Sequence, residues 1–106
     1  MFIVNLTPHA ITLIIDGEDD LVIKPSGRVA RVATSTVTIG DVDGIPVTTT
    51  SFGEVEGLPE PEDGTIYIVS SLVAQRVPER GDVYIPNESV RDERGRIVGC
   101  RSLGRI

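Results

Sequence analysis

The pattern of hydrophobic and polar positions centres on one run, Thr65–Val77. Its first five residues, Thr-Ile-Tyr-Ile-Val, are all β-branched or aromatic. A short run without polar alternation is typical of a central strand that is buried on both faces of a sheet. Ser70 and Ser71 follow, and serine is a preferred residue at the start of a helix. Since Pro78 cannot continue a helix, we predict a central strand followed by one short helix near residues 71–77.

The rest of the chain alternates short apolar runs with turn segments, which favours β-hairpins. The acidic segment Asp16–Asp20 separates two such runs, and the pair Asp43-Gly44 is typical of a tight hairpin turn. The acidic, proline-rich segment Gly53–Gly64 is expected to be irregular. The predicted strands are, in chain order, residues 1–6, 10–15, 21–24, 28–39, 45–52, 65–69, 82–85 and 96–103.

These elements predict the fold class. At 106 residues the chain has the length of one globular domain, residues 1–106. Aromatic residues are few, so the core must consist mostly of Val, Ile and Leu, which suit a pleated sheet. We predict a mainly-β (α+β) protein, a mostly antiparallel barrel or sandwich that carries one short helix.

Charge and cysteine content narrow the function classes. The formal net charge of −6 argues against a general nucleic-acid-binding protein. Residues 65–106 nevertheless carry seven basic residues against five acidic ones, and all seven are Arg, whose planar fork suits phosphate and carboxylate. A genomic preference for Arg over Lys is the alternative explanation. The single cysteine, Cys100, excludes an internal disulfide and indicates a reducing compartment.

The sequence contains no complete catalytic or metal-binding constellation. One His and one Cys do not make a zinc site. The segment Asp16–Asp20 superficially resembles the start of a calcium loop but lacks the later Gly and Glu ligand positions, so a solvated turn is the better interpretation. We therefore expect no cofactor, no metal and no enzymatic activity. An 18-residue apolar run and a leader peptide are also missing, so we expect a cytoplasmic protein without a membrane partner.

The strand-to-helix turn at Ser70 and Ser71 is the candidate site. A helix start presents free N–H groups that can bind a phosphate, and Arg76 and Arg80 could add charge-assisted hydrogen bonds. The alternative is that Ser71 merely caps the helix. Tyrosine or histidine could stack on a base. The candidate ligand-binding residues are Asn5, His9, Tyr67, Ser70, Ser71, Arg76 and Arg80.

Several motifs carry a family resemblance that spans most of the chain. They are Asn5–Ile11 (Asn-Leu-Thr-Pro-His-Ala-Ile), Pro25-Ser26-Gly27, Ala30-Arg31-Val32, Leu58–Pro61, Tyr67–Ser70, Arg80–Val83 with Pro86, and Arg91–Ile97. The chain resembles a family of small uncharacterised proteins of actinobacteria and their phages. The resemblance implies a phage or prophage setting and a stand-alone domain in the host cytoplasm. It transfers no activity, but small phage proteins of this size often counter host defence, sometimes by sequestering a signalling nucleotide.

Two hypotheses about function follow. The first is a non-enzymatic, phage- or prophage-associated binding protein for a small anionic, nucleotide-like ligand, with sequestration of a host defence signal as its role. The alternative is a structural or protein-interaction module of phage origin that acts through a surface patch or an oligomeric interface. Because a domain this small has little concave surface of its own, we also expect a homo-oligomer, most simply a dimer.

Overall fold

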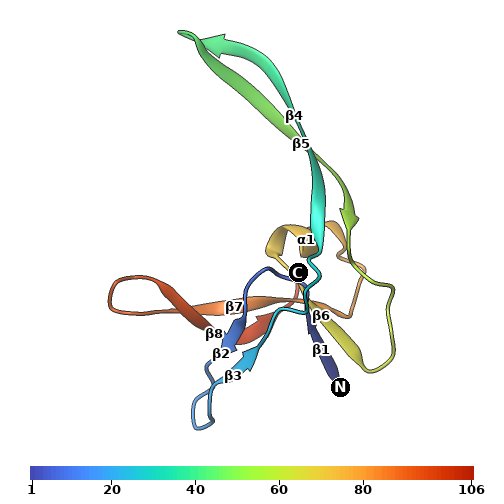
Figure 1. The fold of residues 1–106 in the computed structure, drawn as a ribbon, viewed down its shortest axis with the longest axis vertical. Coiled ribbons are helices and arrows are strands. Elements are labelled where there is room, and N and C mark those ends of the chain that lie inside the picture. The colour runs from blue at the N-terminus through green and yellow to red at the C-terminus, as the bar shows by residue number, and fades with distance from the viewer.

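The computed structural model describes residues 1–106 and contains eight strands and one helix. This confirms the prediction of a mainly-β protein with one short helix (Figure 1). The elements are β1 (Phe2–Asn5), β2 (Ile11–Leu13), β3 (Leu21–Ile23), β4 (Arg31–Val42), β5 (Ile45–Glu56), β6 (Thr65–Ile68), α1 (Ser71–Arg76), β7 (Val83–Arg91) and β8 (Ile97–Gly104).

Six strands form one sheet in the order β1-β6-β7-β8-β2-β3. An isolated bridge between Asn5 and Pro25 joins the end of β1 to the chain just after β3, so the two edges of the sheet approach each other. The sheet is therefore nearly closed and barrel-like. We call this sheet, together with α1, the body of the protein; β4 and β5 form a separate two-stranded sheet.

The pairing within the body is mixed. The hairpin pairs β2–β3 and β7–β8 are antiparallel, as the turn signals indicate, whereas β1–β6, β6–β7 and β2–β8 are parallel. Parallel neighbours need a crossover connection. Helix α1 lies in the connection between β6 and β7, so the strand–serine–helix run forms a βαβ unit. The sequence predicted the strand and the helix of this unit but not the parallel pairing that they produce.

The predicted central strand lies where the sequence places it, between β1 and β7. Tyr67, Ile68 and Val69 are 3%, 0% and 0% exposed, so the run is buried on both faces. Alternate side chains enter two clusters. Tyr67 and Val69 pack with Leu6, Ala30, Val73, Ala74 and Val83, whereas Ile68 packs with Ile11, Leu13 and Cys100. The sheet thus separates two small aliphatic cores.

Helix α1 begins after Ser70 and ends at Arg76, one residue short of the predicted end. Its buried residues, Val73 and Ala74, face the larger core cluster. Strand β7 is longer than expected, because it continues through Pro86 to Arg91. Beyond Tyr84, strand β7 no longer pairs with β6, and a one-sided position of this kind tolerates proline.

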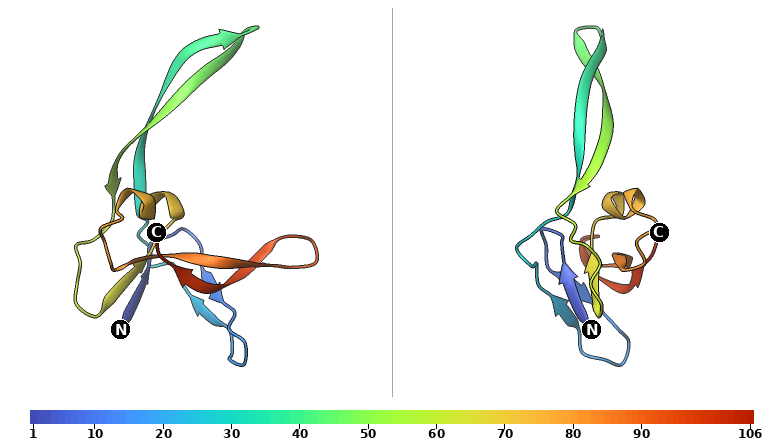
Figure 2. Two further views of the ribbon diagram at one scale, coloured as in Figure 1. Left: turned by 180° about the vertical axis from the view of Figure 1, so that it is seen from behind. Right: turned by 90° about the vertical axis from the view of Figure 1, so that its right-hand side faces the viewer.

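Strands β4 and β5 form a long hairpin that projects from the body (Figures 1 and 2). Its two-residue turn consists of Asp43 and Gly44, both at positive φ (49° and 83°), which confirms the predicted tight turn. Strand β5 extends to Glu56, so the expectation that residues 53–56 are irregular is wrong. Glu56 and Val55 pair with the start of β4, where Val55 lies opposite Val32 and both valines pack on the core.

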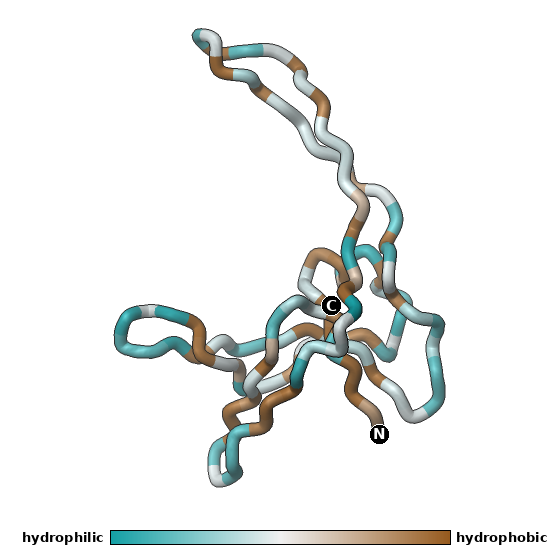
Figure 3. Tube along the Cα trace, in the orientation of Figure 1, coloured by the Kyte–Doolittle hydropathy of each residue, from teal (hydrophilic) through white to brown (hydrophobic).

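We call residues 34–52 of this hairpin the arm. Every residue of the arm is exposed. The radius of gyration is 16.9 Å, compared with about 13 Å for a compact domain of this length. Apolar and polar positions alternate along the arm, whereas apolar positions gather at the centre of the body (Figure 3). The arm therefore extends the molecule without adding to its core.

Candidate functional site

Asn5 is a buried structural residue of the β1–β2 connection. It is 1% exposed, and its Nδ2 donates to the carbonyl oxygens of His9 (2.8 Å) and Ile23 (3.1 Å). Its Oδ1 accepts from the backbone N–H of Thr7 at 2.9 Å. Because the amide is fully engaged, Asn5 fixes the turn around Pro8 and has no group left for a ligand.

His9 lies in the same turn and is exposed. It borders a pocket of about 330 Å³ that also includes Ile11, Pro86 and Cys100. That pocket shares no residue with the one that holds the predicted arginines. The structure therefore does not bring His9 to the arginines.

Tyr67 belongs to the core cluster, and only its hydroxyl reaches a polar partner, the carbonyl oxygen of Glu60 at 3.4 Å. A ring that is 3% exposed cannot stack on a base. The expected ligand contact by Tyr67 is thus replaced by a structural one, which ties the segment before β6 to the core.

The Ser70-Ser71 turn performs helix capping. The Ser70 hydroxyl accepts from the N–H of Val73 at 3.4 Å, and its carbonyl accepts from the N–H of Ala74 at 3.0 Å. Ser71 Oγ accepts from the Gln75 side chain at 3.0 Å. The cap engages the Val73 N–H, one of the donors that a phosphate would need, and a six-residue helix has little dipole. The structure favours capping for this turn, but the capping residue is Ser70 and not Ser71, which is the first residue of the helix.

Arg80 is held in a bidentate ion pair. Its Nε and Nη2 donate to the two carboxylate oxygens of Asp82, both at 2.8 Å, and Nη2 also donates to the carbonyl of Pro59 at 2.9 Å. Both side chains are mostly buried, at 17% and 18% exposed. The hydrogen bond from Arg80 lowers the pKa of Asp82 below its ordinary value, and the same bond raises the pKa of Arg80. Only Nη1 of Arg80 stays without a partner within the protein.

Arg76 lies at the root of the hairpin and forms no ion pair. Its Nη2 donates to the carbonyl oxygens of Phe52 (3.3 Å) and Gly53 (3.4 Å), and so connects α1 to β5. Arg76 therefore keeps an uncompensated positive charge next to the point where the arm leaves the body.

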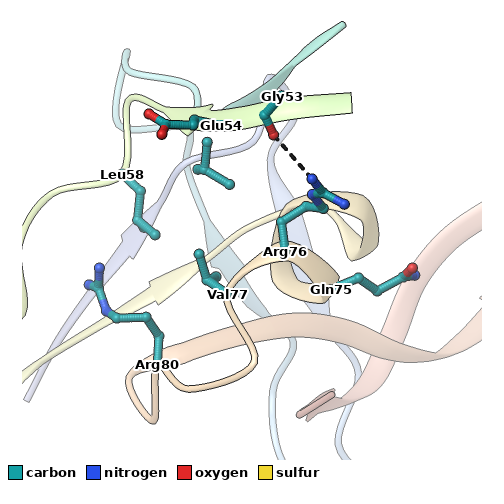
Figure 4. Close-up of a pocket in the computed structure, with 8 residues that line it drawn as sticks. Gly53, Glu54, Leu58, Gln75, Arg76, Val77 and Arg80 are labelled. Carbon is teal, nitrogen blue, oxygen red and sulfur yellow. Dashed lines mark hydrogen bonds between the residues drawn. The ribbon is translucent and has the colours of Figure 1, made fainter. Parts of the chain in front are cut away.

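Arg76 and Arg80 border one pocket of about 470 Å³ between β5, the loop that follows it and α1. Leu58 and Val77 lie between the two arginines (Figure 4). The full lining is Gly53, Glu54, Val55, Leu58, Gln75, Arg76, Val77 and Arg80. Of the seven predicted site residues, the structure brings these two arginines together and leaves the other five elsewhere.

The sequence did not predict six of the pocket residues. Four lie in the segment 53–58, namely Gly53, Glu54, Val55 and Leu58, and two lie at the end of α1, namely Gln75 and Val77. The expectation that Gly53–Gly64 is irregular gave no reason to place Glu54 beside arginines. Gly57 is the one local signal of a built structure. It has φ = 81°, and a Cβ there would lie 2.6 Å from the carbonyl oxygen of Val29. Glycine thus lets the chain pass close to Val29 and turn Leu58 toward the pocket.

The electrostatics of the pocket are mixed. Asp82 compensates Arg80, Arg76 is uncompensated, and Glu54 adds one carboxylate to the rim. The part of the pocket beside Arg76 can therefore accept an anionic group, whereas Glu54 and Gln75 can accept hydrogen bonds from donors of a ligand. No three His, Cys, Asp or Glu side chains are grouped where they could bind a metal ion. No helix has the length and apolar character needed to cross a membrane.

Comparison with known proteins adds no family. No family model, no curated protein and no solved structure matches the chain. The resemblance to small actinobacterial and phage proteins therefore stays a prediction from the motifs.

Proposed function

We propose that the protein binds a small anionic, nucleotide-like ligand, without catalysis, in the pocket between β5 and α1. One observation carries the proposal. Arg76, which has no carboxylate partner, and Arg80, whose Nη1 has no partner within the protein, border the same pocket, with aliphatic side chains between them. The volume of about 470 Å³ is within the range of small-molecule sites.

Each lining residue has a role that follows from its chemistry. Arg76 would donate charge-assisted hydrogen bonds to a phosphate, with Arg80 Nη1 as a second donor. Leu58, Val55 and Val77 would contact the apolar faces of a base or sugar. Glu54 would accept from a hydroxyl or an exocyclic amine. The lining pairs no nucleophile with a base, which is why we propose binding and release rather than turnover.

The biological setting is proposed from the motifs. We propose a phage or prophage origin, residence in the host cytoplasm and sequestration of a host signalling nucleotide. A binding protein that only needs to hold its ligand requires no catalytic group, which is consistent with the composition of the pocket.

The test compares binding of AMP with binding of adenosine by isothermal titration calorimetry. We expect AMP to bind more tightly, because only AMP carries the phosphate. Arg76→Gln should weaken AMP binding by roughly ten- to a hundredfold, the effect of losing a charge-assisted hydrogen bond. Arg101→Gln is the matched control, because this substitution removes the same charge from a residue that does not line the pocket. Arg101 forms an exposed ion pair with Asp16.

Thermal melts must show that both variants fold, because Arg76 also contacts the hairpin root. A folded Arg76→Gln variant that binds AMP as tightly as the parent would contradict the site. If neither AMP nor ADP binds, native mass spectrometry of protein freshly purified from its producing cells decides the proposal. Protein that carries no small molecule would exclude the function.

The alternative, an interaction module, is favoured by a different observation, the exposed arm. We also propose that the chain forms a homo-oligomer.

A further inference from the structure

The arm has two chemically different faces. Cross-strand partners share a face, and Val42 lies opposite Ile45, Gly40 opposite Val47, and Val37 opposite Thr49. One face therefore carries an aliphatic patch, which we define as Val37, Val42, Ile45 and Val47. The other face carries a threonine ladder, Thr34, Thr36, Thr38, Thr48 and Thr50, in which Thr36 and Thr50 approach to 3.3 Å between hydroxyl oxygens.

The aliphatic patch is not covered by any part of the chain. Val37 is 56% exposed, Val42 59%, Ile45 66% and Val47 36%. A single two-stranded hairpin is marginally stable in water without further packing. The four residues of the aliphatic patch share one face of this hairpin, which is the pattern of a half-buried sheet and indicates that a second layer covers this face.

The surface area of the whole chain points in the same direction. The accessible area is 7352 Å². A compact monomer of 11.4 kDa has about 5,800 Å². The excess of roughly 1,600 Å² exceeds the approximately 800 Å² that each partner buries in a standard interface. The chain thus exposes more surface than a stable dimer needs to bury, and the arm, in which every residue is exposed, contributes to that excess.

We propose that the aliphatic patch packs face to face against the same patch of a second copy of this chain. Two-fold symmetry brings identical surfaces together, so an aliphatic patch is its own complement. Each arm would supply one layer of a small sandwich, with the layers about 10 Å apart.

Charge favours a second copy over other occupants. Asp41 and Asp43 at the tip are the only charged side chains of the arm, although the chain as a whole has a net charge of −6. Two copies repel each other over most of their surfaces and least along the arms. A nucleic-acid partner would need basic residues there, and a basic or acidic protein partner would need charges of opposite sign.

The test measures self-association by sedimentation velocity across the micromolar range, using two substitutions at adjacent residues. Val37→Lys places a charge in the proposed interface, whereas Thr36→Lys places the same charge on the opposite face of the same strand. We expect a dimer for the parent protein. The dissociation constant should rise roughly thirtyfold or more for Val37→Lys and less than about threefold for Thr36→Lys.

Ile45→Lys provides an independent test on the other strand and should match Val37→Lys. Amide hydrogen exchange in residues 35–51 should slow as the protein concentration rises. A parent protein that stays monomeric would overturn the proposal. A dimer that survives both Val37→Lys and Ile45→Lys, or that Thr36→Lys disrupts equally, would place the interface elsewhere and also overturn it.

This inference does not depend on the proposed ligand. The aliphatic patch and the pocket share no residue. Measuring AMP binding by the Val37→Lys variant therefore tests the ligand site separately from the dimer. A monomeric variant that binds AMP normally supports the dimer without weakening the ligand site.

Discussion

The body and the arm contain the same kinds of residues, but these residues are buried in the body and exposed in the arm. In the body, the β-branched run at Ile66–Val69 is covered on both faces, and Ile68 and Val69 have no exposed surface. In the arm, an equally β-branched run leaves Val37 and Ile39 56% and 66% exposed. β-Branched composition therefore determines that a strand forms. Whether the strand is buried depends on what the topology places beside it.

The strongest test of this difference in burial is to replace one isoleucine by alanine in each region. Ile68→Ala should lower the free energy of unfolding by about 2–5 kcal/mol, because it leaves a cavity in a closed core. Ile39→Ala should lower it by less than about 0.5 kcal/mol, because the side chain is solvated. Urea unfolding followed by circular dichroism, at a concentration where arms do not associate, gives both values.

Equal effects at the two positions would show that the arm is packed on the body in solution. Such an outcome would remove the distinction between the two regions, and with it the surface excess on which the dimer argument rests. Circular dichroism of the parent protein would also have to show dominant β-structure, as the structure requires.

The second prediction concerns the ion pair between Arg80 and Asp82 at the edge of the pocket. Arg80→Ala removes both bonds to Asp82 and the bond to Pro59, and it leaves a mostly buried carboxylate without a partner. We expect the free energy of unfolding to fall by about 2–4 kcal/mol. Arg101→Ala, at a pair whose carboxylate is 96% exposed, should cost less than about 1 kcal/mol. Urea unfolding of the two variants measures the difference.

The pH dependence of stability tests the same pair. The pKa of Asp82 is lower in the folded protein than its ordinary value of 3.8. An acid with a depressed pKa stabilises the fold above its unfolded pKa, and that contribution is lost as the pH falls through the folded pKa. Between neutral pH and acid, the parent should therefore lose more stability than Asp82→Asn. Parallel curves for the two proteins would mean that the pair contributes little.

The fold was predictable where local signals decide it. The strand β6, the serine cap and the Asp43-Gly44 turn all depend on neighbouring residues, and each lies within one residue of the predicted position. The parallel pairing of β1, β6 and β7 depends instead on where distant segments return to the sheet. No periodicity within a segment carries that information.

The candidate site shows the same limit. Arg76 and Arg80 were predicted as site residues because they lie on or beside the helix. Asp82, only two residues further along the chain, uses most of the Arg80 guanidinium. Tyr67 turns inward to the core, which only tertiary contacts could show. Glu54 and Leu58 join the pocket because β5 continues to Glu56 and Gly57 permits a sharp turn beside Val29.

The smallest expected effect comes from removing the arm. Replacing Thr34–Phe52 by Asn-Gly would join Ala33 to Gly53 through a two-residue hairpin turn. The pairing of Val32 with Val55 would remain, and both residues would still pack on the core. Arg76 donates to the carbonyl oxygens of Phe52 and Gly53. In the deletion variant the new glycine takes the place of Phe52, so it and Gly53 can supply both acceptors.

Because the arm buries little surface of its own, the free energy of unfolding of the body should change by no more than about 1 kcal/mol. The shorter connection also reduces the entropy cost of closing the loop, which partly offsets any lost strand pairing. Self-association should disappear, since the aliphatic patch is gone, while AMP binding should persist because the pocket lining is intact. Urea unfolding, sedimentation velocity and calorimetry on this one variant measure all three. A deletion variant that unfolds would show that the arm supports the body, and one that still dimerises would assign the contact to the body instead.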